Sequence, residues 1–589
     1  MHKTKIAALA LIVPVAASMT VMPARGQQGG AIPEILENYP PVTADRLLNP
    51  EDENWLMIRG TYDGWGFSPL DEITPGNVSG LVPVWGYSTG VARPHESAPV
   101  VNNGVMFITT AESQVIALNA VTGEELWRYR RPRADGSNVP HEVNRGVALW
   151  DDMVLFLAGE AVLVALDAQT GSVVWEQSVA DNSSGYYTTL APLVANDKVM
   201  IGASGGEYGI RGFVAAYDLS DGVEQWRTYL VPEPGQPGSE TWPPDGEQWR
   251  TGGASVWVTG NYDPDTNLAF WGTGNGGPWM GDQRPGDNLY ATSTVALDVD
   301  TGEIRGHFQY HPNDSWDWDE VSPPIVVDFE RDGETVSGLI NVARDGYLWF
   351  LERSEGPIRF VEGKPFVYQN VFTSLDPVTG RPNVDPDRKP GTGKAAWFCP
   401  GLHGGKNWPP ISFSPETRMI YIPANNNLCG QLMGAEEVNY TAGRGFTGTA
   451  RGGPELGPPI REGADHVGEV QAWNVDTGEL VWTHTYARSP NWGGMLVTAG
   501  GIVFNGGTND RRIHAFDAES GDLLWEAPTP SGVLAPPTSF AVDGKQYIAV
   551  LSGWGGDSNG MNNSVSRIWP GEVPSVPSGG TLWVYALED

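Results

Sequence analysis

An eleven-residue pattern that recurs along the chain constrains the fold more than any other feature of the sequence. The pattern is Ala-x-Asp/Asn-x-x-Thr/Ser-Gly-x-x-x-Trp, and its copies lie at 117–127, 165–175, 216–226, 296–306, 472–482 and 515–525. Two copies depart from it: one has Asp221 in the Thr position, and the copy at 296–306 lacks the tryptophan. Each copy predicts a strand, a tight turn at the glycine and a returning strand that carries an aromatic side chain.

The repeats predict a propeller. Apolar segments such as Val105–Thr109 and Val154–Leu157 precede most copies, so each unit has four short strands in roughly 40–50 residues, which is typical of a propeller blade. Their spacing, interrupted by insertions at 231–251 and 431–466, gives seven or eight blades, and we favour eight. The strand expected at Thr581–Leu587 would complete a blade with the N-terminal chain and hide the ring's edges. The predicted fold is all-β, an eight-bladed β-propeller with tryptophan-docking repeats.

The composition agrees with this fold and excludes some partners. The chain has 589 residues, whereas ordinary cores stop growing at roughly 250–300, so a single domain requires a fold that grows by repetition. The 75 glycines and 47 prolines indicate a chain dense in turns. With 36 Lys and Arg against 71 Asp and Glu, the net charge is −35. That charge argues against nucleic acid or an anionic membrane surface as a partner.

The N-terminus has the three parts of a secretory signal. A basic start with Lys3 and Lys5 is followed by the apolar run Ile6–Ala17 and then by small residues near 24–27. A membrane anchor is the alternative, but the run is short and Pro14 interrupts it. We therefore predict a signal peptide at 1–27, one propeller domain at 28–589, export to the periplasm and no membrane span.

The chain has two cysteines, Cys399 and Cys429. An even number in an exported protein suggests one disulfide, with free buried thiols as the alternative. A loop of this length would stabilise the fold by about 3–4 kcal/mol in the chain-entropy description. No Cys-x-x-Cys-His motif occurs, so the sequence predicts no covalently attached haem.

Two aspartates, Asp317 and Asp319, alternate with Trp316 and Trp318. In an extended segment, side chains two residues apart project to the same side, so both carboxylates could meet one ligand. Without a ligand they would repel each other and raise a pKa, and a hard cation removes that cost. A solvated acidic turn is the alternative reading of such a pair by itself.

Several longer stretches carry a specific resemblance. They are 143–149 (VNRGVAL), 206–212 (GEYGIRG), 271–279 (WGTGNGGPW), 284–290 (RPGDNLY), 316–319 (WDWD), 343–346 (ARDG) and 492–496 (WGGML). In order and separation they resemble the quinoprotein alcohol dehydrogenases, which bind pyrroloquinoline quinone (PQQ) in an eight-bladed propeller. The resemblance runs from Trp55 to the C-terminus and implies oxidation of an alcohol.

The resemblance implies a metal site made of oxygen donors. Glu207, Asn275 and Asp317 look like the family's metal-binding Glu, Asn and Asp, and oxygen donors suit a hard cation. Asp319 is similar to the additional aspartate of the lanthanide-dependent branch. A trivalent ion gains from one more negative ligand, so we favour a lanthanide(III), with Ca²⁺ as the alternative.

The resemblance also assigns catalytic and cofactor contacts. Asp317 looks like the general base that removes the alcohol's hydroxyl proton while hydride passes to PQQ, and Arg344 like the arginine that stabilises charge on the quinone. Trp257 resembles the tryptophan on which PQQ stacks. The other implied contacts with PQQ are Glu96, Arg145, Thr189, Ser204, Gly205, Gly206, Arg344, Asn407 and Trp492.

One departure from the family pattern concerns the roof over PQQ. Many members have two adjacent cysteines just before the Val-Asn-Arg-Gly motif, and their disulfide covers the cofactor. Here the positions are Val139 and Pro140, followed by His141 and Glu142, which predicts an apolar, sulfur-free roof. Cys399 and Cys429, in contrast, resemble the family's other, structural disulfide.

The substrate and partners are less determined. A primary alcohol is the default, although the roof and the insertion Tyr440–Thr449 leave bulkier or secondary alcohols open. A separate periplasmic cytochrome c is the expected electron acceptor. A homodimer is one alternative that the sequence does not distinguish from a monomer. A non-catalytic propeller scaffold, or a hydrolase using paired carboxylates, remain alternative functions.

Overall fold

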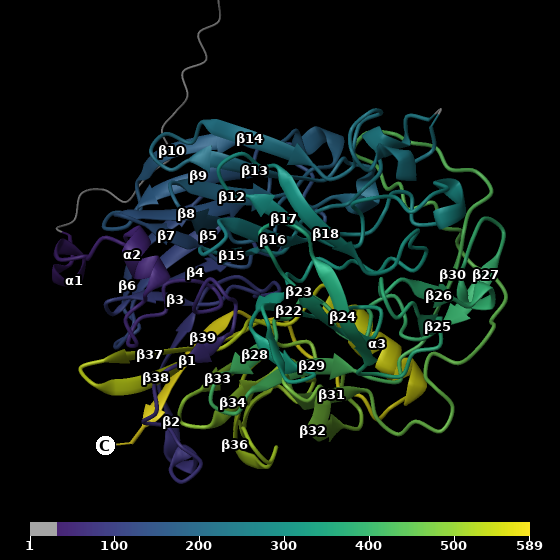
Figure 1. The fold of residues 1–589 in the computed structure, drawn as a ribbon. Helices are drawn as coiled ribbons and strands as arrows, with labels where there is room; N and C mark the ends of the chain where they lie inside the picture. The colour runs from purple at the N-terminus through teal and green to yellow at the C-terminus, as the bar shows by residue number, and fades with distance from the viewer. Residues whose placement is uncertain (1–31, 245, 589) are drawn as a thin grey trace, which may run out of the picture.

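Eight sheets of four or five strands make up the described part of the chain (Figure 1). The computed structural model describes residues 32–244 and 246–588. The predicted signal at 1–27 falls outside these residues. Seven sheets have four strands, and the eighth gains a short fifth strand, β1 (Phe67–Ser68), which pairs parallel with β33. The prediction of an eight-bladed propeller is confirmed.

Consecutive strands form most blades. In chain order these are β3 (Val100–Asn102), β4 (Val105–Thr110), β5 (Gln114–Asn119) and β6 (Glu125–Arg130); β7 (Ala148–Trp150), β8 (Met153–Ala158), β9 (Val162–Asp167) and β10 (Val173–Ser178); β11 (Leu193–Ala195), β12 (Lys198–Gly202), β13 (Phe213–Asp218) and β14 (Glu224–Tyr229); β15 (Asn261–Asp263), β16 (Leu268–Gly272), β17 (Ser293–Asp298) and β18 (Ile304–Gln309).

Three further blades follow in the chain, of which the first two are interrupted by insertions. They are β19 (Ile325–Val326), β22 (Gly338–Val342), β23 (Tyr347–Glu352) and β24 (Arg359–Pro365); β28 (Ser412–Ser414), β29 (Met419–Asn425), β31 (Gly468–Asn474) and β32 (Glu479–Tyr486); β33 (Met495–Thr498), β34 (Ile502–Asn505), β35 (Arg512–Asp517) and β36 (Leu523–Pro528). The insertions include the two-stranded pairs β20 (Phe329–Arg331) with β21 (Glu334–Val336), β25 (Phe372–Leu375) with β26 (Pro382–Val384), and β27 (Ala395–Phe398) with β30 (Gly430–Met433).

The two ends of the chain close the ring. The last blade contains β37 (Thr538–Val542), β38 (Lys545–Ser552) and β39 (Thr581–Leu587), and its fourth strand is β2 (Leu81–Ser88) from the N-terminal region. β2 pairs antiparallel with β39, so the predicted closing strand is confirmed, and Figure 1 shows the yellow β39 beside the purple β2. β2 thereby covers the outer edge of β39 and becomes the outer strand of the last blade.

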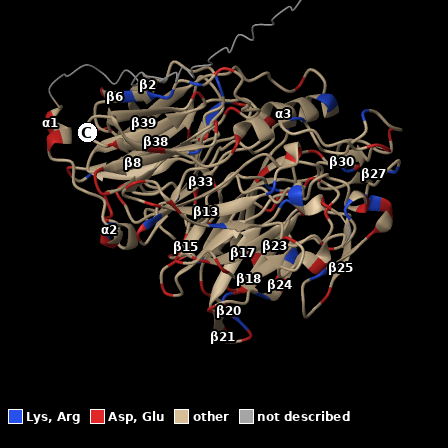
Figure 2. Ribbon diagram, turned by 90° about the horizontal axis from the view of Figure 1, so that it is seen from above, with Lys and Arg blue, Asp and Glu red and all other residues tan. Residues whose placement is uncertain are grey.

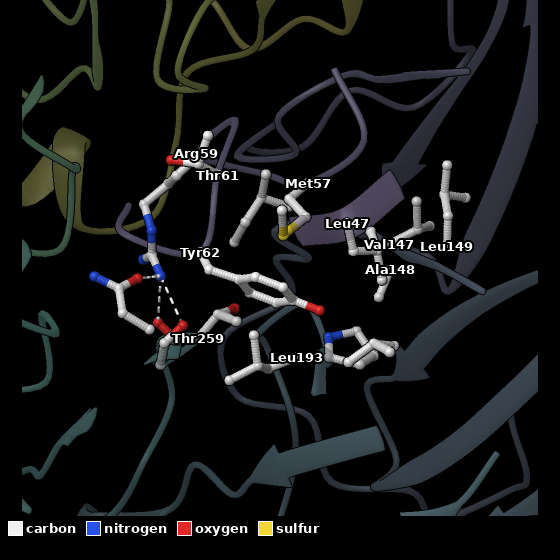
Figure 3. A pocket seen from close by; sticks show the side chains of 15 residues that line it. Leu47, Met57, Arg59, Thr61, Tyr62, Val147, Ala148, Leu149, Leu193 and Thr259 are labelled. Atoms are coloured by element: carbon white, nitrogen blue, oxygen red, sulfur yellow. Dashed lines mark hydrogen bonds between the residues drawn. The ribbon is translucent and has the colours of Figure 1, made fainter. Parts of the chain in front are cut away.

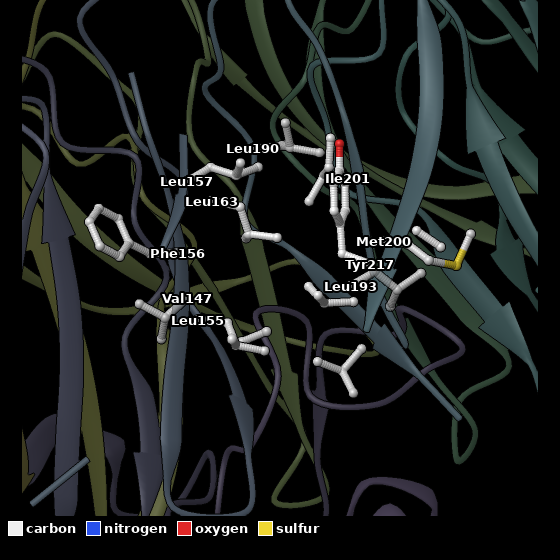
Figure 4. Packing of buried hydrophobic residues seen from close by; sticks show 14 of the residues in the cluster. Val147, Leu155, Phe156, Leu157, Leu163, Leu190, Leu193, Met200, Ile201 and Tyr217 are labelled. Carbon is white, nitrogen blue, oxygen red and sulfur yellow. The ribbon is translucent and has the colours of Figure 1, made fainter. Parts of the chain in front are cut away.

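Apolar side chains fill the space between blades. β8 and β9 are buried along almost their whole length, and Figure 4 shows their side chains facing those of β12 in the next blade. The outer strand β10 is mostly exposed. Burial on both faces explains why the inner strands are continuous apolar runs in the sequence.

The repeated tryptophans join one blade to the next. Trp127 donates its indole N–H to the carbonyl of Ala168 at 2.8 Å, and its ring lies against Gly171 of the following repeat. Gly171 has φ +68°, and a Cβ built there would lie 2.6 Å from the ring, so the turn and the ring both require glycine. Equivalent bonds run from Trp175 to Leu219, Trp226 to Val299 and Trp482 to Ala518.

Helices are few and peripheral. α1 (Glu34–Glu37) and α2 (Ala44–Leu48) precede the blades, and α3 (Asp557–Ile568) lies in the connection between β38 and β39. In the described part of the chain, no helix has the length and apolarity needed to cross a membrane. A disulfide joins Cys399, directly after β27, to Cys429, directly before β30, which confirms the predicted bridge.

Charged side chains lie mainly on loops and outer strands. Figure 2 shows Asp and Glu around the periphery, with fewer Lys and Arg among them and few charges on the inner strands. This arrangement places the large negative charge where water screens it.

Candidate active site

Loops from one end of the blades surround a cavity of about 570 Å³. In an antiparallel four-stranded blade, the loop between the second and third strands and the connection to the next blade emerge at the same end. Predicted site residues on such loops that line the cavity are Glu96, Arg145, Thr189, Ser204, Gly205, Glu207, Trp257, Asp317, Asp319, Arg344 and Asn407. The repeat turns, between the third and fourth strands, lie at the other end.

Arg145 anchors one side of the cavity. Its guanidinium lies 2.7 Å from the Glu96 carboxylate and donates to Thr189 Oγ1 at 2.7 Å. It also lies between two indole rings, 4.9 Å from the centre of Trp257 and 4.7 Å from that of Trp408. Burial raises the pKa of Glu96 to about 7, against the opposing effect of Arg145. The result is a fixed cation at the wall of the cavity.

Three carboxylates, those of Glu207, Asp317 and Asp319, line the same cavity. Asp317 and Asp319 are buried, and Glu207 is half-buried. Burial raises the pKa of Asp317 well above its usual range, and the charges of Asp319 and Glu207 raise it further, while Arg344 opposes this. Burial also raises the pKa of Glu207 and that of Asp319. Negative charges this crowded favour a bound cation.

Asp319 is held by donors from three directions. Its Oδ1 accepts the backbone N–H of Asn275 at 2.7 Å, and its Oδ2 accepts the indole N–H of Trp257 at 3.2 Å. Arg344 lies 3.2 Å from Oδ2 and also donates to the backbone carbonyl of Asp317 at 2.9 Å. Asp319, Arg344 and Trp257 are therefore joined by direct contacts.

Two buried oxygens of this group have no hydrogen-bond partner, namely Asn275 Oδ1 and Asp317 Oδ1. Buried acceptors are normally paired, and each unpaired one is costly. A Cβ on Gly206 would lie 3.0 Å from Asn275 Oδ1, and one on Gly274 would lie 2.4 Å from Asp319 Oδ1, so glycines keep this space open. Unpaired oxygen donors beside carboxylates fit a hard cation.

The local backbone differs from the extended segment expected at Asp317. Asp317 has φ +62°, in the left-handed region. The reason is Asp314, whose carboxylate accepts the backbone N–H groups of Trp316, Asp317 and Trp318 at 3.3, 3.1 and 3.4 Å. The two carboxylates still line one cavity, while the buried rings of Trp316 and Trp318 stack at 4.9 Å. The alternative of a solvated turn is wrong, because both aspartates are buried.

Three predicted residues do not line the cavity. Asn275 and Gly206 lie directly behind the carboxylates, as their contacts show. Trp492 is buried, with its ring 5.6 Å from that of His403, which does line the cavity. The predicted roof residues Val139 and Pro140 are part of the lining.

Sequence reasoning missed part of the lining. The missed residues include Tyr187, Trp279, Leu402, His403, Gly556 and Asp557, of which the last two lie at the start of α3. Trp279 ends the 271–279 motif but is given no role there, and none of the quoted motifs contains the other five. The insertion Tyr440–Thr449 is not in the lining; Phe446 instead donates its backbone N–H to the carbonyl of Glu207 at 2.6 Å. That insertion supports the carboxylate group from behind.

A second, smaller cavity of about 30 Å³ contains none of the predicted residues (Figure 3). Its lining is mostly apolar, with Tyr62 across it, and Arg59 donates to the carbonyls of Thr259 and Gly260. The volume holds little more than a water molecule. It is a packing gap, and the chemistry belongs to the larger cavity.

Comparisons with known proteins identify the family of this chain. The family model described as "PQQ: Glucose/ethanol/alcohol dehydrogenase, beta-propeller domain" matches residues 55–373 and 484–548. Quinoprotein alcohol dehydrogenase PedH of Pseudomonas putida KT2440 is 37% identical over 573 residues, covering 92% of each chain. The chain belongs to the PQQ-dependent quinoprotein alcohol dehydrogenase family.

Other similar proteins include one named as an ethanol dehydrogenase and one whose structure has been solved. A quinoprotein ethanol dehydrogenase of Pseudomonas putida is 33% identical, covering 93% of each chain. The solved structure of a europium-containing methanol dehydrogenase superposes with a TM-score of 0.85 at 34% identity, covering 92% of this chain and all of that one. Family membership makes this protein a PQQ-dependent alcohol dehydrogenase and disfavours a non-catalytic scaffold.

Proposed function

We propose that this protein oxidises an alcohol with PQQ and a lanthanide(III) ion in the 570 Å³ cavity. The observation that carries the proposal is the pair of unpaired buried oxygens, on Asn275 and Asp317, beside the carboxylates of Glu207 and Asp319. Three carboxylates match a trivalent ion better than a divalent one. The similar europium-containing methanol dehydrogenase supports this choice, and Ca²⁺ is the alternative.

The residues divide between the ion and the cofactor. Glu207, Asn275, Asp317 and Asp319 would hold the ion. PQQ would stack on Trp257, with its carboxylates and carbonyls bound by Arg145, Thr189, Ser204, Asn407 and neighbouring glycines. Bound PQQ supplies the electron-accepting quinone, and the ion supplies Lewis acidity.

Asp317 would act as the base. Its carboxylate lines the cavity and its Oδ1 is free to accept the alcohol's hydroxyl proton. Burial and neighbouring carboxylates raise its pKa, and a cation beside it would counteract that rise and keep it ionised near neutral pH. Arg344 lies 3.2 Å from Asp319. Its guanidinium would stabilise the negative charge that develops during the reaction.

The substrate, acceptor and location are further parts of the proposal. Val139 and Pro140 give the cavity an apolar wall, which favours a primary alcohol with a hydrocarbon chain. Electrons would pass to a soluble cytochrome c, and the net charge of −35 would attract a basic one. The signal-like residues 1–27 support export to the periplasm.

A dye-linked oxidation assay tests the proposal. Metal-free protein would be reconstituted with PQQ and with either lanthanum or calcium, and assayed with methanol, longer primary alcohols and secondary alcohols. We expect turnover that needs PQQ and is highest with lanthanum. Turnover with calcium alone would overturn the lanthanide assignment, and absence of both turnover and PQQ binding would overturn the function.

A further inference from the structure

A histidine outside the cavity links the two loops that carry the proposed catalytic groups. His311 is completely buried in the connection between β18 and β19. Its Nε2 lies 3.1 Å from Glu320 Oε1 and its Nδ1 lies 3.4 Å from Asp314 Oδ1. Burial alone would lower the pKa of His311, but the two carboxylates outweigh burial and raise it to about 10. The ring thus lies between two buried carboxyl groups.

Asp314 holds the backbone of the loop that carries Asp317, the proposed base. The Asp314 carboxylate accepts the N–H groups of three consecutive residues, including Asp317 at 3.1 Å. Those bonds hold Asp317 at φ +62°, which a non-glycine residue adopts only when its surroundings impose it. Any movement of the Asp314 carboxylate would release the backbone of Asp317.

The Glu320 side controls the turn of the proposed arginine. Glu320 accepts the backbone N–H of Arg344 at 3.1 Å and that of Asp345 at 3.4 Å. Arg344 then reaches Asp319 and the carbonyl of Asp317. The Asp317 loop connects β18 to β19, and the Arg344 turn joins β22 to β23 of the blade that β19 begins. His311 contacts a carboxyl group that holds each of these segments.

We propose that His311 is a positioning residue. Through Asp314 and Glu320 it fixes the position of the Asp317 loop relative to the Arg344 turn. The inference rests on the proposed function for the roles of Asp317 and Arg344. Packing supports it, because the ring meets Trp316 and Trp318 edge-on at 6.5 and 5.6 Å. His311 therefore contacts the two tryptophans that alternate with the aspartates as well as the groups that hold the backbone.

A cation held by His311, Glu320 and Asp345 is the competing arrangement, since their ligand atoms lie within 4.8 Å of one another. The carboxylates are already engaged, however. Asp345 accepts the backbone N–H of Tyr347 at 2.8 Å and the indole N–H of Trp349 at 3.1 Å, and Glu320 accepts two backbone N–H groups. The oxygens of both carboxyl groups therefore already accept hydrogen bonds, which disfavours an additional ion there.

The test compares His311→Gln and His311→Leu with a matched control, His514→Gln. His514 is also buried and its Nε2 lies 3.1 Å from a carboxylate, that of Asp510, but it lies on β35 outside the cavity lining. With PQQ and lanthanum, we expect His311→Gln to lower kcat about 10–100-fold with a smaller change in KM. His311→Leu should be worse, and His514→Gln should keep the wild-type kcat.

Two readouts do not depend on turnover. Terbium luminescence, sensitised by nearby tryptophans, should show weaker binding in His311→Gln and unchanged binding in His514→Gln. Hydrogen exchange of the PQQ- and metal-free proteins should show faster exchange at the N–H groups of 316–318 and of 344–345 only in the His311 variants. Those exchange data hold even if the wild type proves inactive, so failure of the function and failure of this inference are distinguishable.

Three results would overturn the inference. Unchanged exchange at either segment in both His311 variants would show that His311 does not hold the loops. If His514→Gln lost as much kcat as His311→Gln, the loss in the His311 variant would be explained by lower overall stability. A second bound metal ion in the wild type, lost in His311→Gln, would make the cluster a cation site.

Discussion

The two ends of the blades use buried polar groups in opposite ways. At the end with the repeat turns, the tryptophans satisfy their indole N–H groups, as Trp127 does on Ala168 at 2.8 Å. At the other end, Asn275 Oδ1 and Asp317 Oδ1 are buried without partners, and three carboxylates share one cavity. The first arrangement lowers the free energy of the fold, whereas the second raises it until a ligand binds.

This difference separates stability from function within one repeated architecture. A blade can have a turn whose polar groups are hydrogen-bonded at one end and a loop with unpaired polar groups at the other, because its strands connect the two ends rigidly. Substitutions at the repeat end should therefore change unfolding, and substitutions at the cavity end should change binding and turnover.

The largest effect is expected at the cavity end. Asp317→Asn removes the proposed base and should lower kcat about 10²–10⁴-fold in the reconstituted enzyme. The metal-free variant should be at least as stable as the wild type, because one of the repelling carboxylates is gone. The assay is dye-linked turnover with lanthanum, paired with thermal unfolding.

The control for that prediction is Asp298→Asn in a repeat turn, where the carboxylate accepts the N–H groups of Asp300 and Thr301. It should lower the thermal midpoint and leave kcat unchanged. If Asp317→Asn retained wild-type turnover, Asp317 would not be the base.

At the repeat end, Trp127→Ala should lower the free energy of unfolding by about 3–5 kcal/mol, because it empties a buried site between two blades. Urea unfolding measures this, and turnover per folded molecule should not change. Trp127→Phe should cost less, since it keeps much of the packing. If Trp127→Ala lost kcat at urea concentrations well below its unfolding transition, the proposed separation of stability and turnover between the two ends of the blades would be contradicted.

Removing the additional carboxylate should affect metal choice. We expect Asp319→Ala to weaken lanthanide binding about 10-fold or more and calcium binding less, because the trivalent ion loses more Coulomb attraction. Terbium titration with calcium competition measures both affinities. Equal lanthanum-supported activity in Asp319→Ala and wild type would refute the metal assignment.

The smallest effect concerns pH. Burial raises the pKa of Glu96 to about 7 from an ordinary value of 4.5, so the folded chain binds this proton more tightly than the unfolded chain. The stability from Glu96 is then complete below pH 4.5 and is lost as the pH rises through about 7. Glu96→Gln should flatten the fall of the thermal midpoint between those pH values, and an unchanged slope would exclude Glu96 as its source.

Much of the fold was predictable from local pattern. The strands around each repeat, the closing strand Thr581–Leu587 and the pairing of Cys399 with Cys429 all agree with the structure. Such features depend on a few neighbouring residues or on the count of cysteines. The resemblance also selected many of the residues that line the cavity, among them Arg145, Asp317 and Arg344.

The rest needed the tertiary structure. The sequence by itself determined a ring of tryptophan-linked blades and the chemical types available to its loops. Only the closed ring brings loops from different blades together around the cavity. The tertiary structure also shows that Asp314 holds Asp317 in the left-handed region and that His311 lies between Asp314 and Glu320. Those contacts join residues distant in the chain through buried charges, and their geometry depends on how every blade packs against its neighbours.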